Sequence, residues 1–356
     1  MQVTIGLFTH NHEKFVIPAL RGVLQQTYRP LEVLITDDAS IDRTPELIRA
    51  ELERYQGPQK VQFYANARNL ALSLNINQHM EVATGELYVI ASGDDISYPN
   101  RVQRLVEAFR ASGPETMSLH SNARKIDENG NCLGLFFAST PSPWRCENPG
   151  DARKFHGVWV AGATHAWSPR VFEVFGPLPC GVNYEDWVIP FRSGLMGRIV
   201  YVNDVLVDYR LHGSNLWFGN VDVRSGRRKW YADKLRHVEQ EIAALGCKEK
   251  DLALAHHKLP ERQAVISSLE EMNRRALADA MASRELLQNN VSFRRKVILA
   301  GKYFRNSRNF KPGLVWFLTY FFPSAYLTYI QVRTALARRN GLRLERKPDG
   351  SCQRQL

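Results

Sequence analysis

The first 110 residues alternate short apolar runs with segments of helical periodicity, and this alternation limits the folds open to the chain. Four runs have the length and composition of strands, at residues 3–8, 31–36, 61–64 and 87–91. Three segments carry apolar residues at helical spacing, at residues 14–26, 45–55 and 72–84. Strands separated by helices of this length form βαβ units, so the sequence predicts an α/β fold with a mostly parallel sheet flanked by helices.

Polar clusters follow three of the expected strands. They are Thr9-His10-Asn11, Asp37-Asp38 and Gly93-Asp94-Asp95. Ligands of parallel sheets bind at the carboxyl ends of the strands, where these clusters are expected to lie. A lone acidic pair is more often a solvated turn. Two such pairs at one edge of a sheet favour a site for a divalent cation, because adjacent carboxylates repel each other without one, and their hard oxygens suit Mg²⁺ or Mn²⁺.

A third acidic pair, Glu185-Asp186, lies between Tyr184 and Trp187. Aromatic surroundings raise the pKa of a carboxyl group and can make it a general base near neutral pH. The pair could equally cap the helix that follows, and one role does not exclude the other. His212 is expected in a loop after an apolar strand, where a single histidine is usually structural.

These residues together resemble the family 2 glycosyltransferases. The resemblance covers about residues 1–218, and its motifs occur in the family's order and spacing: Thr9-His10-Asn11, Gln25 to Tyr28, Glu32 to Thr44, Asn77 with Ala83 to Glu86, Gly93 to Ile96 with Pro99 and Arg101, Glu185 to Trp187, and Tyr209 to Asn215. It implies a GT-A (Rossmann-like) fold and an inverting transfer of a sugar from a nucleotide-diphospho-sugar to an acceptor hydroxyl. One catalytic carboxylate is enough for such a single displacement.

The resemblance also implies a role for each matching residue. The donor nucleotide and its sugar would be bound by a set of polar residues: Thr9, His10, Asn11, Asp38, Asn77 and Asp94. Asp95 would hold the metal on the diphosphate, with His212 a possible further ligand. Asp186 would deprotonate the acceptor hydroxyl, supported by Glu185.

The chain divides into three parts by composition. Residues 1–218 are expected to form the catalytic domain, with a nucleotide-binding half at about 1–110 and an acceptor half at about 111–218. Residues 219–290 are expected to form a helical extension that could bind the acceptor, form a dimer or connect to a membrane. Residues 291–356 form a basic, aromatic-rich tail.

The net charge of +11 belongs to that tail. Residues 291–356 hold 14 Lys or Arg and 2 Asp or Glu, whereas the first 290 residues hold 33 basic and 34 acidic residues. The body of the chain therefore offers no basic groove, and no nucleic-acid partner is expected. Residues 312–332 are uncharged and rich in Trp, Tyr and Phe, a composition that favours attachment at a membrane surface over spanning or a buried hairpin.

The expected place of action is the cytoplasmic face of a membrane, with a lipid-linked or surface-polysaccharide acceptor. The 5 scattered cysteines are expected to be reduced thiols. One alternative is a nucleotidyltransferase, although no Gly-rich basic loop follows the first strand. The other is a protein that binds a sugar or nucleotide without catalysis, with Trp167, Trp187 or Trp217 stacking on a ring.

Overall fold

The computed structural model describes residues 1–137 and 151–287, apart from 157, 159, 183, 214 and 216–226, and short pieces at 294, 298, 344–346 and 352–354. The chain separates into two compact units. The first contains Met1–Leu211 and Cys247–Glu270, and the second contains His212–Gly246 and Glu271–Leu356. Residues 247–270 thus belong to the unit that holds the sheet, although the composition groups them with the helical extension. The three-part division stays a prediction.

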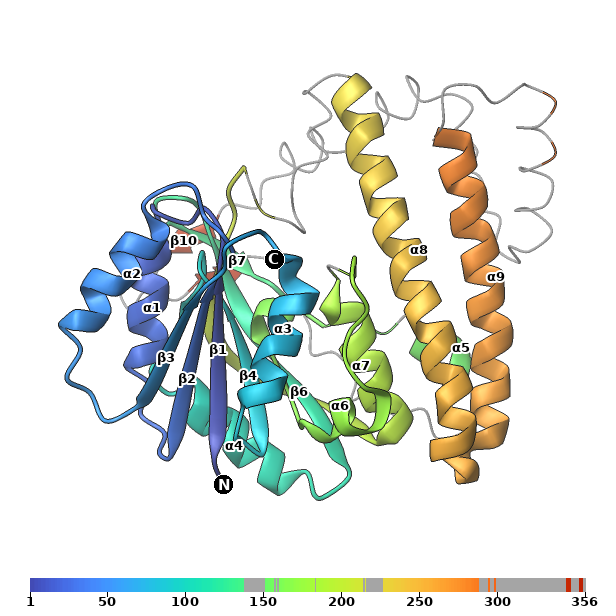
Figure 1. Ribbon diagram of the computed structural model, residues 1–356, viewed down its shortest axis with the longest axis horizontal. Coiled ribbons are helices and arrows are strands. Elements are labelled where there is room, and N and C mark those ends of the chain that lie inside the picture. The colour runs from blue at the N-terminus through green and yellow to red at the C-terminus, as the bar shows by residue number, and fades with distance from the viewer. Residues whose placement is uncertain are drawn as a thin grey trace. The chain divides into compact units, whose positions relative to one another are not determined.

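A mixed sheet forms the centre of the first unit (Figure 1). Among the described residues its strands are β1 (Val3–Thr9), β2 (Leu31–Asp37), β3 (Lys60–Ala65), β4 (Leu87–Ser92), β5 (Ile96–Ser97), β6 (Thr116–Ile126), β7 (Cys132–Leu135), β8 (His165–Trp167) and β9 (Arg198–Arg210). Their order across the sheet is β3-β2-β1-β4-β8-β6-β9-β5, with β7 paired to β6. The first four strands are parallel to one another, and β8 joins them to β6 by antiparallel pairing on both sides.

Helices cover both faces of the parallel half. Figure 1 shows α1 (Val16–Leu24) and α2 (Thr44–Glu53) on one side of the strands and α3 (Ala71–Val82) on the other. The remaining helices are α4 (Arg101–Ala111), α5 (Ala152–His156), α6 (Arg170–Phe175), α7 (Glu185–Met196), α8 (Arg227–Lys258) and α9 (Gln263–Leu287), with short 3₁₀ turns η2 (Gly162–Thr164) and η3 (Pro260–Arg262). A short hairpin of β10 (Leu344–Arg346) and β11 (Cys352–Arg354) belongs to the second unit. The expected α/β sheet and C-terminal helices are confirmed.

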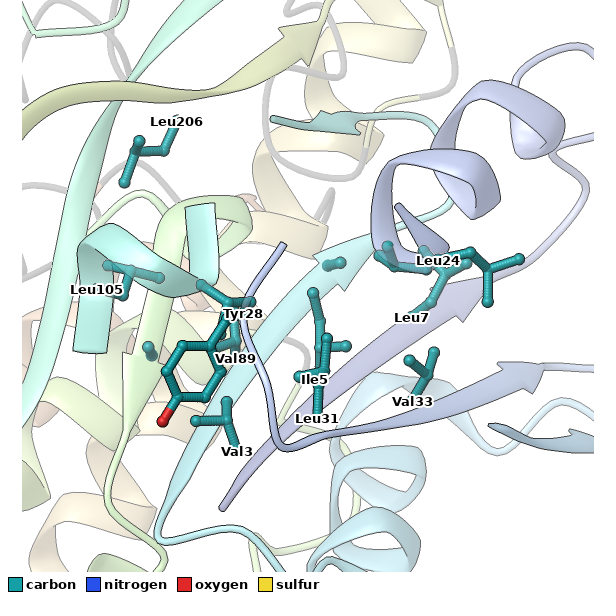
Figure 2. Packing of buried hydrophobic residues seen from close by; sticks show 14 of the residues in the cluster. Val3, Ile5, Leu7, Leu24, Tyr28, Leu31, Val33, Val89, Leu105 and Leu206 are labelled. Carbon is teal, nitrogen blue, oxygen red and sulfur yellow. The ribbon is translucent and has the colours of Figure 1, made fainter. Parts of the chain in front are cut away.

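The core of the first unit forms on one face of β1. Val3, Ile5 and Leu7 are completely buried and pack with Leu24 of α1 and Val89 of β4 (Figure 2). Full burial of such a side chain stabilises the fold by about 1.5–3 kcal/mol. Helices on both faces leave no exposed side of β1, which explains why all seven residues of this strand are buried rather than every second one.

The register of the parallel strands brings their carboxyl ends level. Thr9 pairs with Asp37, Asp37 with Ala65, and Phe8 with Ser92. Backbone bonds continue this alignment into the loops, since the Asp38 N–H donates to Thr9 O at 2.9 Å and the Gly93 N–H donates to Phe8 O at 2.8 Å. The polar clusters after β1, β2 and β4 therefore lie side by side at one edge.

A buried ion pair attaches the second half of α8 to α7. Arg192 of α7 donates through Nε and Nη2 to the two carboxylate oxygens of Asp251, at 2.8 and 2.9 Å. Its Nη1 donates to Gly176 O at 2.7 Å, and its side chain is about as buried as any in the unit. A paired guanidinium whose donors are satisfied can be buried at acceptable cost. The part of α8 around Asp251 is thereby fixed to the helix that begins with Glu185-Asp186.

No helix in the part of the chain that the structure describes is long and apolar enough to cross a membrane. Residues 312–332, which the sequence assigns to membrane attachment, lie outside the described residues. Cys132 is disulfide-bonded, whereas Cys180 and Cys247 are free thiols. The expectation that every cysteine is a reduced thiol is therefore wrong for Cys132. Spacing along the chain does not show which cysteines the fold brings within bonding distance.

Three buried histidines make the stability of the first unit depend on pH. Burial lowers the pKa of His79 to about 3 and that of His120 to about 4, and it lowers the pKa of His165 well below its usual range. In the unfolded chain each histidine binds a proton below about pH 6.5. The contribution of these histidines to the free energy of unfolding should therefore be constant above neutral pH. It should fall as the pH decreases from 6.5 towards 4.

His120→Gln should weaken this dependence, because the unfolded state of the variant binds one proton fewer. The expected change in slope is up to about 1.4 kcal/mol per pH unit below pH 6. Urea unfolding of wild type and variant at pH 7, 6 and 5 measures it. Identical slopes in the two proteins would show that His120 is not buried in its neutral form.

Candidate active site

Asp37 stabilises the loop after β2 from inside. Its Oδ1 accepts bonds from Thr9 Oγ1 at 3.1 Å and Ser40 Oγ at 2.5 Å, and its Oδ2 accepts from the Ser40 N–H at 3.0 Å. Thr9 also donates to Thr36 O at 3.2 Å and is buried. The Thr9 hydroxyl thus holds two strand ends together.

Asp38 caps the start of α3. Its Oδ1 accepts from the Leu70 N–H at 2.8 Å and from Asn66 Nδ2 at 2.9 Å, and its Oδ2 accepts from the Ala71 N–H at 3.0 Å. Amides at a helix start have no partner within the helix, and a carboxylate there is stabilised by the helix dipole. The sequence motifs imply only a nucleotide-binding role for Asp38. The structure adds this cap and leaves nucleotide binding a prediction.

His10 is exposed but held in one orientation. Its Nδ1 lies 2.8 Å from Asp38 O, so this nitrogen carries the proton and donates it. Nε2 is then the acceptor for Asn11 Nδ2 at 3.0 Å, and Asn11 Oδ1 accepts the Ile41 N–H at 2.9 Å. The loops after β1 and β2 therefore present a fixed, solvent-facing imidazole at the edge of the sheet.

Three residues at this edge have left-handed backbone conformations without being glycine. They are Asn11 (φ 56°), Ala39 (φ 56°) and Ala71 (φ 65°), and each follows one of the strands β1 to β3. This conformation costs a residue with a Cβ about 1–2 kcal/mol, and such strain gathers at functional sites. The concentration of strain here identifies this edge as the place where backbone position matters most.

Ala71→Gly should raise the free energy of unfolding by about 0.5–1 kcal/mol, because glycine adopts φ 65° without steric cost. The matched control is Ala50→Gly within α2, where the backbone is helical and glycine should cost about 1 kcal/mol. Chemical denaturation of both variants measures the difference. Destabilisation by both substitutions would contradict strain at Ala71.

The Gly93-Asp94-Asp95 turn follows β4 and is tightly enclosed. A Cβ on Gly93 would lie 2.6 Å from His12 Nδ1 and 2.7 Å from Thr9 Cγ2, so only glycine fits. Asp95 is buried, and its Oδ1 accepts the Arg210 N–H at 2.8 Å. The Arg210 guanidinium donates from Nε to Asp94 O at 3.0 Å. Strand β9 therefore fixes both acidic residues of the turn.

Burial, and secondly the charge of Asp94, raise the pKa of Asp95 well above its usual range. A buried carboxyl group beside another carboxylate has to take up a proton or a cation. Two hard oxygen ligands, completed by phosphate oxygens of a substrate, suit Mg²⁺ or Mn²⁺. Among the described residues no group of three or more His, Cys, Asp or Glu could hold a metal by itself. The acidic turn thus fits a cation that is shared with a substrate.

His212 belongs to the second unit, where its N–H donates to Asn215 Oδ1 at 2.6 Å. Its part in metal binding stays a prediction. Asn77 bonds in both directions to the backbone of Leu178, with Nδ2 donating to the carbonyl and Oδ1 accepting the N–H, each at 2.8 Å. Its amide therefore fastens α3 to the segment before α7, and donor binding by Asn77 also stays a prediction.

Glu185 and Asp186 are the first two residues of α7, and both are buried. Burial raises the pKa of Glu185 to about 7. Burial and then the charge of Glu185 raise the pKa of Asp186 well above its usual range. Within the described residues, Asp186 Oδ1 has no hydrogen-bond partner. A buried carboxylate oxygen without a partner is costly unless a proton, a water or a substrate satisfies it.

The charges of both acidic pairs act on Tyr209 of β9. Burial raises the pKa of the Tyr209 phenol, and the next causes in order are the charges of Asp95, Asp94, Asp186 and Glu185. Tyr209 precedes Arg210, whose N–H bonds to Asp95. The fold thus brings together four carboxylates from two distant parts of the chain.

Two contributors to the site lie outside the sequence motifs. A Cβ on Gly162 would lie 2.6 Å from Glu185 Oε1 and 3.6 Å from Asp186 Oδ2, so this glycine lets η2 approach the acidic pair. Lys248 of α8 donates to His156 O at 3.2 Å, and its charge lowers the pKa of Asp186. Nothing in the sequence marks either residue, because only tertiary packing brings them to α7.

Residues 4–151 match the family described as "Glycosyl transferase family 2". An uncharacterised protein of Mycobacterium tuberculosis is 26% identical over 272 residues, which cover 75% of this chain and 72% of the relative. An uncharacterised glycosyltransferase of a Nostoc species is 28% identical over 221 residues, or 60% of this chain and 66% of the relative.

Solved structures show the same fold. Residues 1–349 of Staphylococcus aureus TarS align with a TM-score of 0.53 at 13% identity, over 100% of this chain and 96% of that chain. The mannosyltransferase PcManGT from Pyrobaculum calidifontis, in complex with GDP-Man and Mn²⁺, aligns with a TM-score of 0.50 at 18% identity, over 93% and 86%.

The fold is therefore GT-A, and the chain is a glycosyltransferase. Its similarity to family 2 covers residues 4–151, which contain the sequence motifs from Thr9 to Arg101.

Asp186→Asn should stabilise the protein at high pH. The folded Asp186 carboxyl retains its proton above the pKa of the unfolded chain, so the free energy of unfolding falls as the pH rises from about 4 through the raised pKa of the folded state. An amide has no charge to bury, and the expected gain is about 1–3 kcal/mol at pH 8, shrinking towards pH 5.

Thermal unfolding of wild type and Asp186→Asn at pH 5, 6.5 and 8, in EDTA, measures this difference. A melting temperature of the variant that stays at or below wild type at pH 8 would show that Asp186 is solvated in the folded protein.

Proposed function

We propose that this enzyme transfers a sugar, with inversion, from a nucleotide-diphospho-sugar to an acceptor hydroxyl, and that Asp186 is the general base. The observation that carries the proposal is the buried Asp186 carboxylate, which has one oxygen without a partner among the described residues and which shares the surroundings of Tyr209 with the Asp94-Asp95 turn. Such a displacement needs a base for the acceptor hydroxyl and, close to it, carboxylates that can hold a cation on the donor diphosphate.

The donor nucleotide would bind over the loops after β1, β2 and β3. The fixed imidazole of His10 offers a ring for stacking on a base, and Asn11 and Asp38 form the surrounding loops with Thr9 beneath them. Asn77 would act on the donor through the segment it holds. TarS has been solved with UDP-GlcNAc and PcManGT with GDP-Man, which supports a nucleotide sugar as the donor class.

Asp95, with Asp94 beside it, would hold Mg²⁺ or Mn²⁺, and His212 is proposed as a further ligand. When bound, the cation would neutralise charge that develops on the leaving diphosphate. The protein's own contribution is to keep the two carboxylates together, through the Arg210 bonds to Asp95 Oδ1 and Asp94 O. Asp94 would face the ribose and the sugar.

Asp186 would accept the proton of the acceptor hydroxyl as that oxygen attacks the anomeric carbon. A base works best when its pKa lies near the operating pH, and burial moves the pKa of Asp186 in that direction. Glu185 would support Asp186 by its charge, and the charge of Lys248 lowers the pKa of Asp186 in the opposite sense. A single in-line displacement without a covalent intermediate inverts the anomeric centre.

The acceptor is proposed to be a lipid-linked or surface-polysaccharide glycan, reached at the cytoplasmic face of a membrane. The basic, aromatic-rich composition of residues 291–356 supports this proposal. Deletion of these residues should release the protein from anionic vesicles. A nucleotidyltransferase would instead consume a nucleoside triphosphate, and a pure binding protein would consume nothing.

The test is turnover of UDP-GlcNAc, GDP-mannose and a dTDP-sugar, each with Mn²⁺ or EDTA, measured as released nucleotide, with a CMP-sugar as the control donor that has no diphosphate. One donor should be consumed only with metal. Asp186→Asn should lower kcat by about 10²- to 10⁴-fold and retain the thermal shift caused by the nucleotide. Asp95→Ala should lose the metal-dependent part of that shift.

Asp204→Asn is the matched control, because Asp204 is an exposed acid paired with Arg104 on the surface. It should leave kcat within about twofold. Weakened donor binding in Asp186→Asn would mean that the base is misassigned. Consumption of a nucleoside triphosphate, or no turnover with any donor, would contradict the proposed function.

A further inference from the structure

Arg101, the first residue of α4, is a completely buried guanidinium with three defined acceptors. Its Nη1 donates to Ser97 Oγ at 2.8 Å. Its Nη2 donates to two backbone carbonyls, Ile90 O at 2.8 Å and Ala163 O at 2.9 Å. No described carboxylate lies within ion-pair distance of this cation, so Arg101 is bound chiefly as a hydrogen-bonding fork.

Two of the acceptors flank the acidic turn of Asp94-Asp95. Ile90 belongs to β4, just before the turn, and Ser97 belongs to β5, just after it. One side chain thus binds the chain on both sides of the turn. Asp95 is also the carboxylate whose charge acts on Arg101, which keeps the guanidinium protonated although burial lowers its pKa to about 9.

The third acceptor lies in the turn beside the proposed base. Ala163 follows Gly162, where a Cβ would lie 2.6 Å from Glu185 Oε1. Strands β4 and β8 pair only at Tyr88–Trp167 and Val89–Ala166. Where this pairing stops, Arg101 connects the β4 backbone to η2 in its place.

We propose that Arg101 is a positioning residue that sets the distance between the metal-side turn, Asp94-Asp95, and the base-side pair, Glu185-Asp186. The inference rests on the proposed function of these two pairs. A guanidinium holds several acceptors in one fixed plane, whereas a lysine ammonium is a single point on a flexible stem. The charge alone is therefore not enough, and the fork geometry is what the site needs.

Arg101→Lys should lower kcat by about 100-fold, because a displacement of about 1 Å between reacting groups costs that much. KM for the donor should change much less than kcat, since the nucleotide loops after β1 to β3 do not contact Arg101 and only the acidic turn of the donor site does. The assay uses the nucleotide sugar that the wild type consumes, with circular dichroism and nucleotide-induced thermal shift as checks of folding.

Arg192→Lys is the matched control. Arg192 is equally buried, and its fork binds Asp251 and Gly176 O rather than the acidic turn. It should lose thermal stability to a similar extent as Arg101→Lys, with a clearly smaller loss of kcat, because its fork binds neither the acidic turn nor η2. If replacing any buried arginine lowered kcat, the two variants would lose kcat to the same extent.

Ser97→Ala keeps the test decisive if Arg101→Lys does not fold. It removes one acceptor of the fork and buries no new charge, and we expect kcat to fall about tenfold at unchanged donor KM. Combined with Gly162→Ala, which presses on Glu185 from the other end, the effects on kcat should be non-additive, since both act on one distance.

Wild-type kcat in folded Arg101→Lys, or in Ser97→Ala where that variant decides, would overturn the inference and leave the proposed function intact. A parallel loss of donor binding and kcat would also overturn it, because that would mark Arg101 as purely structural. Absence of turnover by the wild type itself would overturn the proposed function and this inference with it.

Discussion

The level carboxyl ends of β1, β2 and β4 are the constraint on which the site depends. Parallel pairing of Thr9 with Asp37 and of Phe8 with Ser92 leaves the chain no choice about where the following loops lie. The ladder that holds the hydrophobic core together therefore also sets the positions of His10, Asp38 and the acidic turn. A slip of one residue would turn the buried side chains of β1 to the other face, so the core fixes the register and the register fixes the site.

Most of the fold and part of the site follow from the sequence because their signals are local. Apolar runs with β-branched residues predicted the parallel strands, and strand ends carrying Asp38 and Asp95 predicted one edge for the ligand. Arg101 and Glu185 were visible as members of motifs, but their contacts were not. The guanidinium of Arg101 joins Ile90 to Ala163, residues more than 70 positions apart, and no periodicity encodes such a contact.

Other features could not be predicted, for reasons that differ from one residue to another. Gly162 matters only because η2 packs against α7, and Lys248 only because the Arg192–Asp251 pair brings α8 to the same helix. The cap that Asp38 provides for α3 has no signal in the sequence, since an aspartate 33 residues before the first residue of a helix is not recognisable as its cap. Cys132 shows the same limit, because a disulfide reflects distance in the fold rather than spacing in the chain.

The energetics of the site explain why its parts are held so firmly. Buried carboxyl groups with raised pKa values, an unpartnered oxygen on Asp186 within the described residues and left-handed backbone at Asn11, Ala39 and Ala71 all cost folding free energy. Each cost is tolerated because rigid contacts surround it, from Arg210 at the acidic turn to the Asp38 cap at α3. If the site could relax, the repulsion between its carboxylates would move them apart. Here the apolar core and the buried guanidinium of Arg101 hold the charges close, so that a substrate and a cation can relieve the repulsion.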